Sequence, residues 1–121
     1  MFILDSSAII EIFHGTEAGN KIVMFLEGKK FSVTSFSVYE IFFREKEKEK
    51  LNELISSTDI FVFDEGAAET AVSIEKNLKK SGSMINDIDI FIAAICMQTN
   101  STLITCDNDF KKISGLDAAF F

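Results

Sequence analysis

The sequence predicts an α/β fold, a three-layer α/β/α sandwich whose central sheet is mainly parallel. Short apolar runs that end in polar turns, such as residues 2–4 and 102–105, are typical of buried strands. Segments with the apolar spacing of helices stand between these runs. Strands that alternate with helices form parallel sheets covered on both faces. The 121 residues contain no linker, repeat or low-complexity segment, so we expect one domain over residues 1–121.

The first third of the chain predicts two strands and two helices. An apolar run leads into a Ser-Ser turn that can cap a helix, and His14-Gly15 ends that helix. A second apolar face follows Thr16, and an alternating segment then indicates a strand. The expected elements are a strand at 2–4, a helix at 6–13 capped by Ser6 or Ser7, a helix at 16–27 and a strand at 31–37.

The middle of the chain predicts a charged helix. Ser37-Val38-Tyr39-Glu40 fits a Ser-x-x-Glu capping box, which places the helix start at Glu40. The helix is expected to extend to about Lys50 and to continue through Ile55. Its alternating charged run is typical of a solvent-facing surface.

The second half of the chain repeats the alternation of strands and helices. Ser81-Gly82 ends a long helix, and Asn86 or Asp87 caps the next one. That next helix places Ile88, Phe91, Ile92 and Ile95 on one face. The expected elements are a strand at 59–64, helices at 65–80 and from 87, a strand at 102–105, a short helix after Asp109 and an edge strand at 118–121.

Composition points to an acidic chain in a reducing compartment. Lys and Arg total 12 against 19 Asp and Glu, which gives a net charge of −7. Nucleic-acid binders are usually basic, so charge alone argues against that role, although a carboxylate-built active site explains part of the excess. Cys96 and Cys106 fit small buried apolar residues. Without a signal peptide or a membrane-length apolar run, we expect a soluble, cytoplasmic protein that contacts no membrane.

Four acidic residues are expected to meet at one edge of the sheet. Asp5 and Asp107 follow the two most apolar strands, while Glu40 and Asp89 begin predicted helices that point to the same edge. Each residue alone is more simply explained as a helix cap or first-turn acid. Together they repel one another unless a cation joins them. Oxygen ligands alone favour Mg²⁺ or Mn²⁺, and a pair of such ions suits phosphodiester hydrolysis.

Four motifs in chain order carry a family resemblance. They are Asp5-Ser6-Ser7 after a strand, Ser35-Phe36-Ser37-Val38-Tyr39-Glu40, Asp89-Ile90-Phe91-Ile92-Ala93-Ala94, and Thr105-Cys106-Asp107-Asn108-Asp109-Phe110 before Gly115-Leu116. The chain resembles the PIN domain, a small metal-dependent ribonuclease fold, and most closely the VapC-like toxins of toxin–antitoxin pairs. It departs from the family at Ser7, where Asn is usual, and at Arg44, where Gly is common.

The resemblance implies a function and a set of site residues. Asp5, Glu40, Asp89 and Asp107 become the expected catalytic residues and metal ligands. Ser6 and Thr105 are expected to hydrogen-bond carboxylates or water. Asp87 and Asp109 remain auxiliary candidates, more simply explained as a cap and a turn residue. The implied protein is a Mg²⁺- or Mn²⁺-dependent endoribonuclease, the toxin of a type II toxin–antitoxin system, with an RNA substrate, a small antitoxin partner and a homodimeric state.

Three alternative functions remain open from the sequence. The fold also suits an RNA-processing nuclease or a non-catalytic interaction domain. A phosphate-receiver signalling module has a similar size and architecture, but it needs paired acids after the first strand, a phosphorylatable Asp after the third and a Lys after the fifth. Here Ser-Ser follows Asp5, and Cys-Asp follows residues 102–105. The receiver hypothesis is therefore the weakest of the three.

Overall fold

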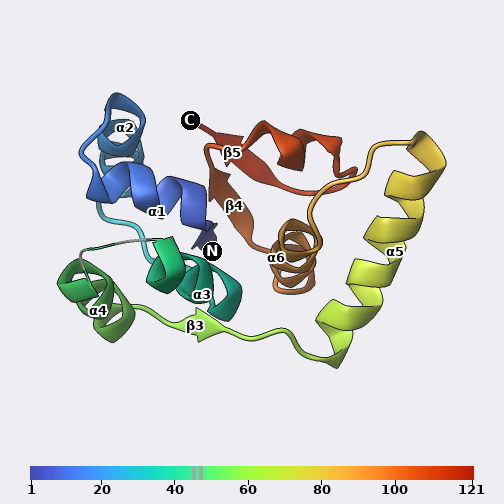
Figure 1. The fold of residues 1–121 in the computed structure, drawn as a ribbon, viewed down its shortest axis with the longest axis horizontal. Helices are drawn as coiled ribbons and strands as arrows, with labels where there is room; N and C mark the ends of the chain where they lie inside the picture. Colours follow the sequence, from blue (N-terminus) through green and yellow to red (C-terminus); the bar gives the residue numbers. More distant parts are fainter. Residues whose placement is uncertain (45, 47) are drawn as a thin grey trace.

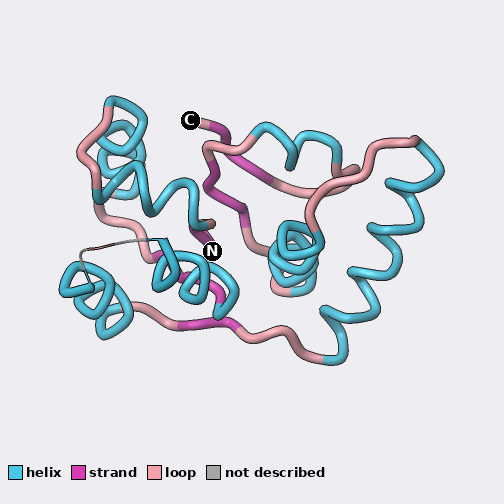
Figure 2. Tube along the Cα trace, in the orientation of Figure 1, coloured by secondary structure: helices cyan, strands magenta, loops and turns pink. Residues whose placement is uncertain are grey.

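A parallel sheet occupies the centre of the molecule. The computed structural model describes residues 1–44, 46 and 48–121. Within them, the strands are ordered β3-β2-β1-β4-β5, and every neighbouring pair is parallel. Figure 2 shows the strands enclosed by helices. The predicted α/β fold is confirmed. The strand bounds are β1 Phe2–Leu4, β2 Phe31–Thr34, β3 Ile60–Phe61, β4 Thr102–Thr105 and β5 Ala118–Phe120.

Helices cover both faces of the sheet. Figure 1 shows α1, α2 and α4 on one side of the strands, and α5 and α6 on the other. Ile3 and Leu103 pair in register and pack with α5 and α6, whereas Leu4 and Ile104 pack with α1 and α2. The bounds are α1 Ser6–Phe13, α2 Glu17–Leu26, α3 Ser35–Arg44, α4 Lys48–Ser57, α5 Glu65–Ser81, α6 Asp87–Gln98 and a 3₁₀ helix, η1, Asn108–Lys112.

The predicted start of α3 at Glu40 is wrong. The helix begins at Ser35, immediately after β2. Thr34 provides the cap, because its Oγ1 accepts the backbone N–H of Ser37 at 3.2 Å. Ser37, the expected cap, is instead fully buried inside the helix. The Ser-x-x-Glu pattern was misleading because an equally good hydroxyl cap stands three residues earlier.

The predicted continuous helix through Ile55 is also wrong. α3 ends at Arg44, Lys46 lies in a bend, and α4 begins at Lys48. Residues 45 and 47, which the prediction included, lie outside the described part of the chain. Leu51 is buried in α4, and Leu54 and Ile55 pack against the same core, so the apolar residues and not the charged run determine how this helix packs.

Other element boundaries differ in smaller ways. The predicted strand at 59–64 shortens to β3, since Asp64 caps α5 by accepting the Ala67 N–H at 2.8 Å. Asp5, and not Ser6 or Ser7, caps α1. Gly82 ends α5 as expected, with φ of 68°. The two caps share one cause, because in α1 and α5 the aspartate before the helix accepts the backbone N–H of the third helical residue.

Helix α6 is buried on more than the one predicted face. Ile92 and Ile95 are buried as expected, but Ile88 and Phe91 are only half-buried, whereas Ile90 is buried. The helix packs against both α5 and β4, so two of its sides are buried. Similarly, α5 buries Ala71, Ile74 and Leu78, while Val72 is 50% exposed. None of the described helices is long and apolar enough to cross a membrane.

Candidate metal and active site

Asp5 lies at the carboxyl end of the central strand β1. It is buried, with 3% of its surface exposed. One carboxylate oxygen accepts the Ala8 N–H at 3.0 Å and the Ser7 hydroxyl at 2.7 Å. The other oxygen accepts the Thr105 hydroxyl at 2.7 Å. Burial still raises the pKa of Asp5 to about 6, because desolvation outweighs these hydrogen bonds and the charge of Asp107 adds to it.

Three further carboxylates converge beside Asp5. Asp89 stands in the first turn of α6, Asp107 caps η1, and Asp109 lies within η1. Oxygens of these three residues lie within 4.8 Å of one another. Their placement follows from topology, because β4 ends beside β1 and α6 points its N-terminus to the same edge. The expected convergence of strand ends is therefore seen for Asp5, Asp89 and Asp107.

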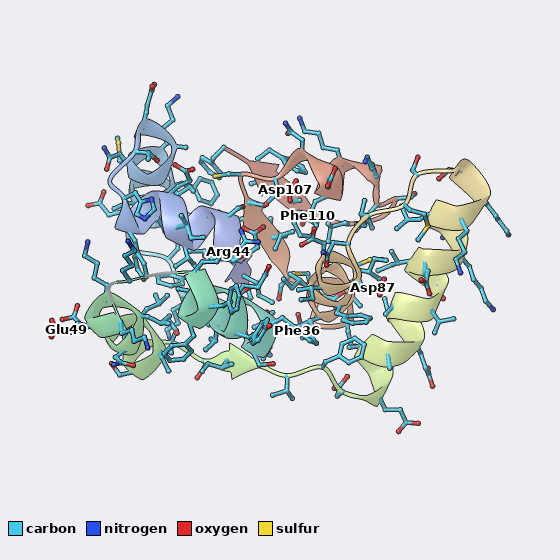
Figure 3. The ribbon with its side chains drawn as sticks, viewed as in Figure 1. Phe36, Arg44, Glu49, Asp87, Asp107 and Phe110 are labelled. Carbon is cyan, nitrogen blue, oxygen red and sulfur yellow. The ribbon has the colours of Figure 1, made fainter. Side chains whose placement is uncertain are left out.

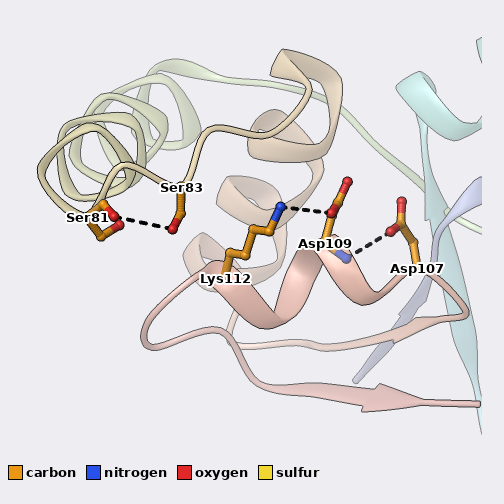
Figure 4. Close-up of polar contacts among 5 residues, drawn as sticks. All are labelled: Ser81, Ser83, Asp107, Asp109 and Lys112. Carbon is orange, nitrogen blue, oxygen red and sulfur yellow. Dashed lines mark hydrogen bonds and ion pairs between the residues drawn. The ribbon is translucent and has the colours of Figure 1, made fainter.

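Hydrogen bonds in the β4–η1 turn orient this part of the site. Asp107 accepts the backbone N–H of Asp109 at 2.9 Å, and Lys112 pairs with Asp109 at 3.1 Å (Figure 4). The Thr105 hydroxyl accepts the Asp107 N–H at 3.0 Å while it donates to Asp5. Thr105 thus links the two strand-end aspartates, and Figure 3 shows Asp107 at the junction of β4 and η1.

Glu40 reaches the site from α3. Its side chain is half-buried and accepts the Ser6 hydroxyl at 3.0 Å. Although Glu40 does not begin a helix as predicted, its position in the second turn of α3 brings it to the N-terminus of α1. Ser6 therefore contacts a site carboxylate, as the resemblance implied.

Asp89 experiences the charges of all four other acids. Burial raises its pKa first, followed by the charges of Asp107, Glu40, Asp5 and Asp109, to about 7. Burial and facing negative charges both raise the pKa of a carboxyl group, because each disfavours its ionised form. The five carboxylates thus form one electrostatic unit, which we call the acidic cluster: Asp5, Glu40, Asp89, Asp107 and Asp109.

The two auxiliary candidates, Asp87 and Asp109, lie in different places. Asp109, for which a turn role was the simpler explanation, lies in the acidic cluster. Asp87 is exposed and lines a groove with Phe63 and Phe91. The cap of α6 is Asn86, whose side chain accepts the Ile88 N–H at 2.8 Å. The sequence signal for Asp109 was its position two residues after Asp107. The 3₁₀ helix η1 begins between them and brings the two carboxylates together.

Ser7 is a site residue to which the sequence assigned no contact. It stands where Asn is usual in the PIN pattern, yet its hydroxyl donates to Asp5 and accepts the Cys106 N–H at 2.9 Å. The substitution therefore keeps a hydrogen bond to the central aspartate. The motif position itself was the only signal that could have identified it.

The acidic cluster fits a divalent cation. Its ligand atoms are all oxygens, the set that hard ions such as Mg²⁺ prefer. Among the described residues, the salt bridge at the cluster is the one between Lys112 and Asp109, and both of those side chains are about half exposed. Carboxylates with raised pKa values gain most from a cation, because a bound charge offsets their mutual repulsion. The residues present could therefore hold a metal ion.

Comparison with known proteins agrees with this geometry. The PIN domain family model matches residues 2–116. Ribonuclease VapC3 of Methanocaldococcus jannaschii is 34% identical over 95 residues, which cover 77% of this chain and 95% of that protein. A small parallel α/β fold with carboxylates gathered at its strand ends is the PIN architecture. The chain belongs to the PIN domain family.

Solved structures confirm the fold. VapBC2 from Rickettsia felis, bound to a promoter DNA fragment, matches with a TM-score of 0.81 and 19% identity over 99% of this chain and 98% of the other. VapBC-1 from nontypeable Haemophilus influenzae has a TM-score of 0.81 and 19% sequence identity, and the match covers 98% of this chain and 96% of that one. A toxin–antitoxin complex from Klebsiella pneumoniae has a TM-score of 0.75 and 21% sequence identity, and the match covers 96% of this chain and 95% of that one. At these identities the likeness concerns the fold.

Proposed function

We propose that this protein is a divalent-metal-dependent endoribonuclease and the toxin of a type II toxin–antitoxin pair. The observation that carries the proposal is the acidic cluster, which gathers Asp5 and four other carboxylates at one sheet edge. A ribonuclease relative that aligns with most of the chain supports the reaction, and the toxin–antitoxin complexes of the same fold support the biological role. The substrate is RNA, cut at an internal phosphodiester bond.

Within this proposal, Asp5, Glu40, Asp89 and Asp107 are the catalytic metal ligands, and Asp109 joins them. The ion is Mg²⁺ or Mn²⁺. Once bound, it would supply an activated water and neutralise charge on the phosphate. The chain's own contribution is orientation, because Ser7 and Thr105 hold the Asp5 carboxylate and Ser6 holds Glu40. Groups held this way need little reorganisation when substrate binds.

The proposed protein partner is a small antitoxin. One observation beyond the toxin–antitoxin relatives supports a protein ligand. An apolar cavity of about 490 Å³ lies among α1, α2 and α4, and among the described residues on its wall only Glu27 is charged. A cavity of this kind suits apolar side chains of a polypeptide and offers little to a phosphate. A neighbouring gene that encodes a small antitoxin-like protein would separate a toxin from an RNA-processing nuclease.

The non-catalytic alternative is less well supported. An interaction domain has no need for five clustered carboxylates, whose repulsion destabilises the folded chain. Retention of Asp5, Glu40, Asp89 and Asp107 together is more economically explained by catalysis.

Cleavage of RNA tests the proposal directly. Purified protein with Mn²⁺ or Mg²⁺ should cut a panel of single-stranded and structured RNAs, as resolved on denaturing gels, and EDTA should stop the reaction. The matched control is Asp5→Asn, which keeps the shape of the side chain and loses its charge. Cleavage that continues in EDTA and survives Asp5→Asn would exclude a metal nuclease centred on this site.

A further inference from the structure

A small pocket lies between the C-terminal half of α5 and η1. Its volume is about 200 Å³, which is below the roughly 300 Å³ at which pockets for drug-sized ligands begin. Its floor is apolar and consists of Ile74, Leu78 and Ile113, which are all buried. We call this hollow the α5–η1 pocket. Its size and its floor suit one ring system.

Lys112 joins the α5–η1 pocket to the acidic cluster. Its side chain lines the pocket, and its amine pairs with the Asp109 carboxylate at 3.1 Å. Figure 4 shows Lys112 between Ser81, at the rim of the pocket, and the two cluster residues Asp107 and Asp109. Pocket and cluster are therefore separated by the length of one lysine side chain, a span that one nucleotide can bridge.

The rim of the pocket offers hydrogen-bonding groups. Besides Lys112 it consists of Asn77, Ser81 and Ser114, which are all exposed. The Ser81 hydroxyl donates to the backbone oxygens of Asn77 and Leu78 at 3.3 and 3.1 Å, so its own oxygen can still accept. Within the described part of the chain, no residue hydrogen-bonds the Asn77 side chain. Enzymes that bind a single base hold it against apolar side chains and hydrogen-bond its edge, and this pocket provides both kinds of contact.

We propose that the α5–η1 pocket binds one nucleotide of the RNA substrate, next to the phosphodiester bond that lies at the acidic cluster. The base packs on Ile74 and Ile113, and the Asn77 amide hydrogen-bonds its edge. Lys112 binds the phosphate between pocket and cluster. This inference rests on the proposed ribonuclease function, and it adds Asn77 as a residue that determines which base stands beside the cut.

Charge supports a nucleotide as the occupant. Although the whole chain is acidic, Lys79 and Lys80 stand in the last turn of α5, and Lys111 and Lys112 in the last turn of η1. Cations therefore border the pocket on both sides, and Lys and Arg are the residues that bind nucleic-acid phosphates. The Lys111 amine lies over the Phe120 ring, 5.0 Å from its centroid. Lys112 is thus the lysine of η1 that faces the site.

Nucleotide titrations test the pocket without metal and without cleavage. The four ribonucleoside monophosphates and inorganic phosphate are each added to isotope-labelled protein in EDTA, and the backbone amide signals are followed by NMR. At least one nucleotide should give saturable shifts at Asn77, Ser81 and Ser114. Inorganic phosphate should bind there about tenfold more weakly, because it lacks the contacts of the base.

Three variants separate the expected contacts. Lys112→Gln removes the charge and should weaken every nucleotide about tenfold, since a hydrogen bond to a charged group is lost. Lys111→Gln is the matched control outside the pocket and should change affinity less than about twofold, because solvent screens its charge. Asn77→Leu should change the order of preference among the four bases. All three residues are exposed, and the amide spectra check that each variant is folded.

The outcomes are decisive for the pocket. Absence of saturable shifts with every nucleotide overturns the proposal, as do equal effects of Lys112→Gln and Lys111→Gln. Inorganic phosphate that binds as tightly as the nucleotides would leave an adventitious anion site only. An unchanged order of bases in Asn77→Leu would overturn the role of Asn77.

RNA cleavage is scored separately, so that the pocket and the proposed function can fail independently. Sequencing of the cut ends should show a base preference beside the cut, and Asn77→Leu should alter it. A wild type that binds nucleotides in the pocket but cuts no RNA contradicts the ribonuclease function alone. Cleavage without nucleotide binding in the pocket contradicts the pocket alone.

Discussion

Asp5 has two roles whose effects on stability oppose each other. As the cap of α1 it accepts the Ala8 N–H, which is worth roughly 0.5–2 kcal/mol. As a member of the acidic cluster it is a buried charge whose pKa is raised to about 6. Asn keeps an oxygen for the cap and removes the charge, so it separates the two roles.

We therefore expect Asp5→Asn to melt at the same or a higher temperature than wild type in EDTA at pH 7.5. A metal that binds only the folded state stabilises it by about 2.7 kcal/mol at 100 times its Kd. Mn²⁺ should thus raise the wild-type melting temperature and raise that of the variant much less, as scanning fluorimetry measures. Equal metal responses would mean that Asp5 acts only as a cap; Asp5→Ala, which loses both roles, serves as the comparison.

Asp89 and Asp87 should differ sharply when each is changed to Asn. Asp89 lies in the acidic cluster, whereas Asp87 is exposed and lines a separate groove with Phe63 and Phe91. Asp89→Asn should abolish metal-dependent cleavage. Asp87→Asn should keep activity and cost about 0.3–1 kcal/mol, because Asn86 is the cap and Asp87 contributes only its first-turn charge. Cleavage rates and urea unfolding of both variants measure this, and the opposite pattern would reassign the ligand.

Among the elements, the α1–α2 pair depends on one glycine. A Cβ at Gly19 would lie 2.1 Å from the backbone oxygen of Glu11, closer than any real contact. The oxygen belongs to the backbone and has no rotamer through which to move aside. The small residue is therefore required by the close approach of α2 to the end of α1, and Gly19 is itself buried.

Gly19→Ala should lower the free energy of unfolding by about 1–3 kcal/mol, the usual cost of overpacking. Its control is Asn20→Ala, at the next and exposed position of the same helix, which should change stability by less than about 0.5 kcal/mol. Chemical denaturation of both variants gives the comparison. A Gly19→Ala protein as stable as wild type would show that the two helices can separate freely.

At the scale of the whole molecule, the acidic cluster makes stability depend on pH. Asp5 and Asp89 have folded pKa values of about 6 and 7, above the ordinary value of 3.8. At a pH between 3.8 and these folded pKa values, the folded chain binds more protons than the unfolded chain. Rising pH therefore favours unfolding. The contribution of these two residues to stability is full below pH 3.8 and is lost as pH rises through 6 to 7.

In EDTA, wild type should therefore be less stable than Asp89→Asn already at pH 5, where Asp89 is ionised in the unfolded chain but protonated in the folded chain, and the difference should be larger at pH 7.5. Urea titrations at the two pH values measure this difference. Comparison within each pH cancels the titration of all other groups. A difference that is equal at both pH values would show that the charge of Asp89 is not what destabilises the folded chain.

Local chemistry determined the fold class and most of the site. The apolar runs that end at Asp5 and Asp107 were readable because buried parallel strands need continuous apolar residues. Strand ends in such a sheet share one edge with the N-termini of the helices that follow, so Asp5, Glu40, Asp89 and Asp107 could be expected together from the sequence. The Gly82 end of α5 and the cap at Asn86 or Asp87 likewise depend on neighbours in the chain.

Only the tertiary structure decided what depends on distant residues. Helix α3 is capped by Thr34 and not by Ser37. Both residues could serve as the cap, but Ser37 is buried in the core within the helix. Asp109 lies in the acidic cluster and Asp87 lies outside it, although a simple local role explained each of them in the sequence. A carboxylate's direction is set by how its helix is rotated against the sheet, and that rotation is fixed by the apolar contacts of the whole core, which no short stretch of sequence contains.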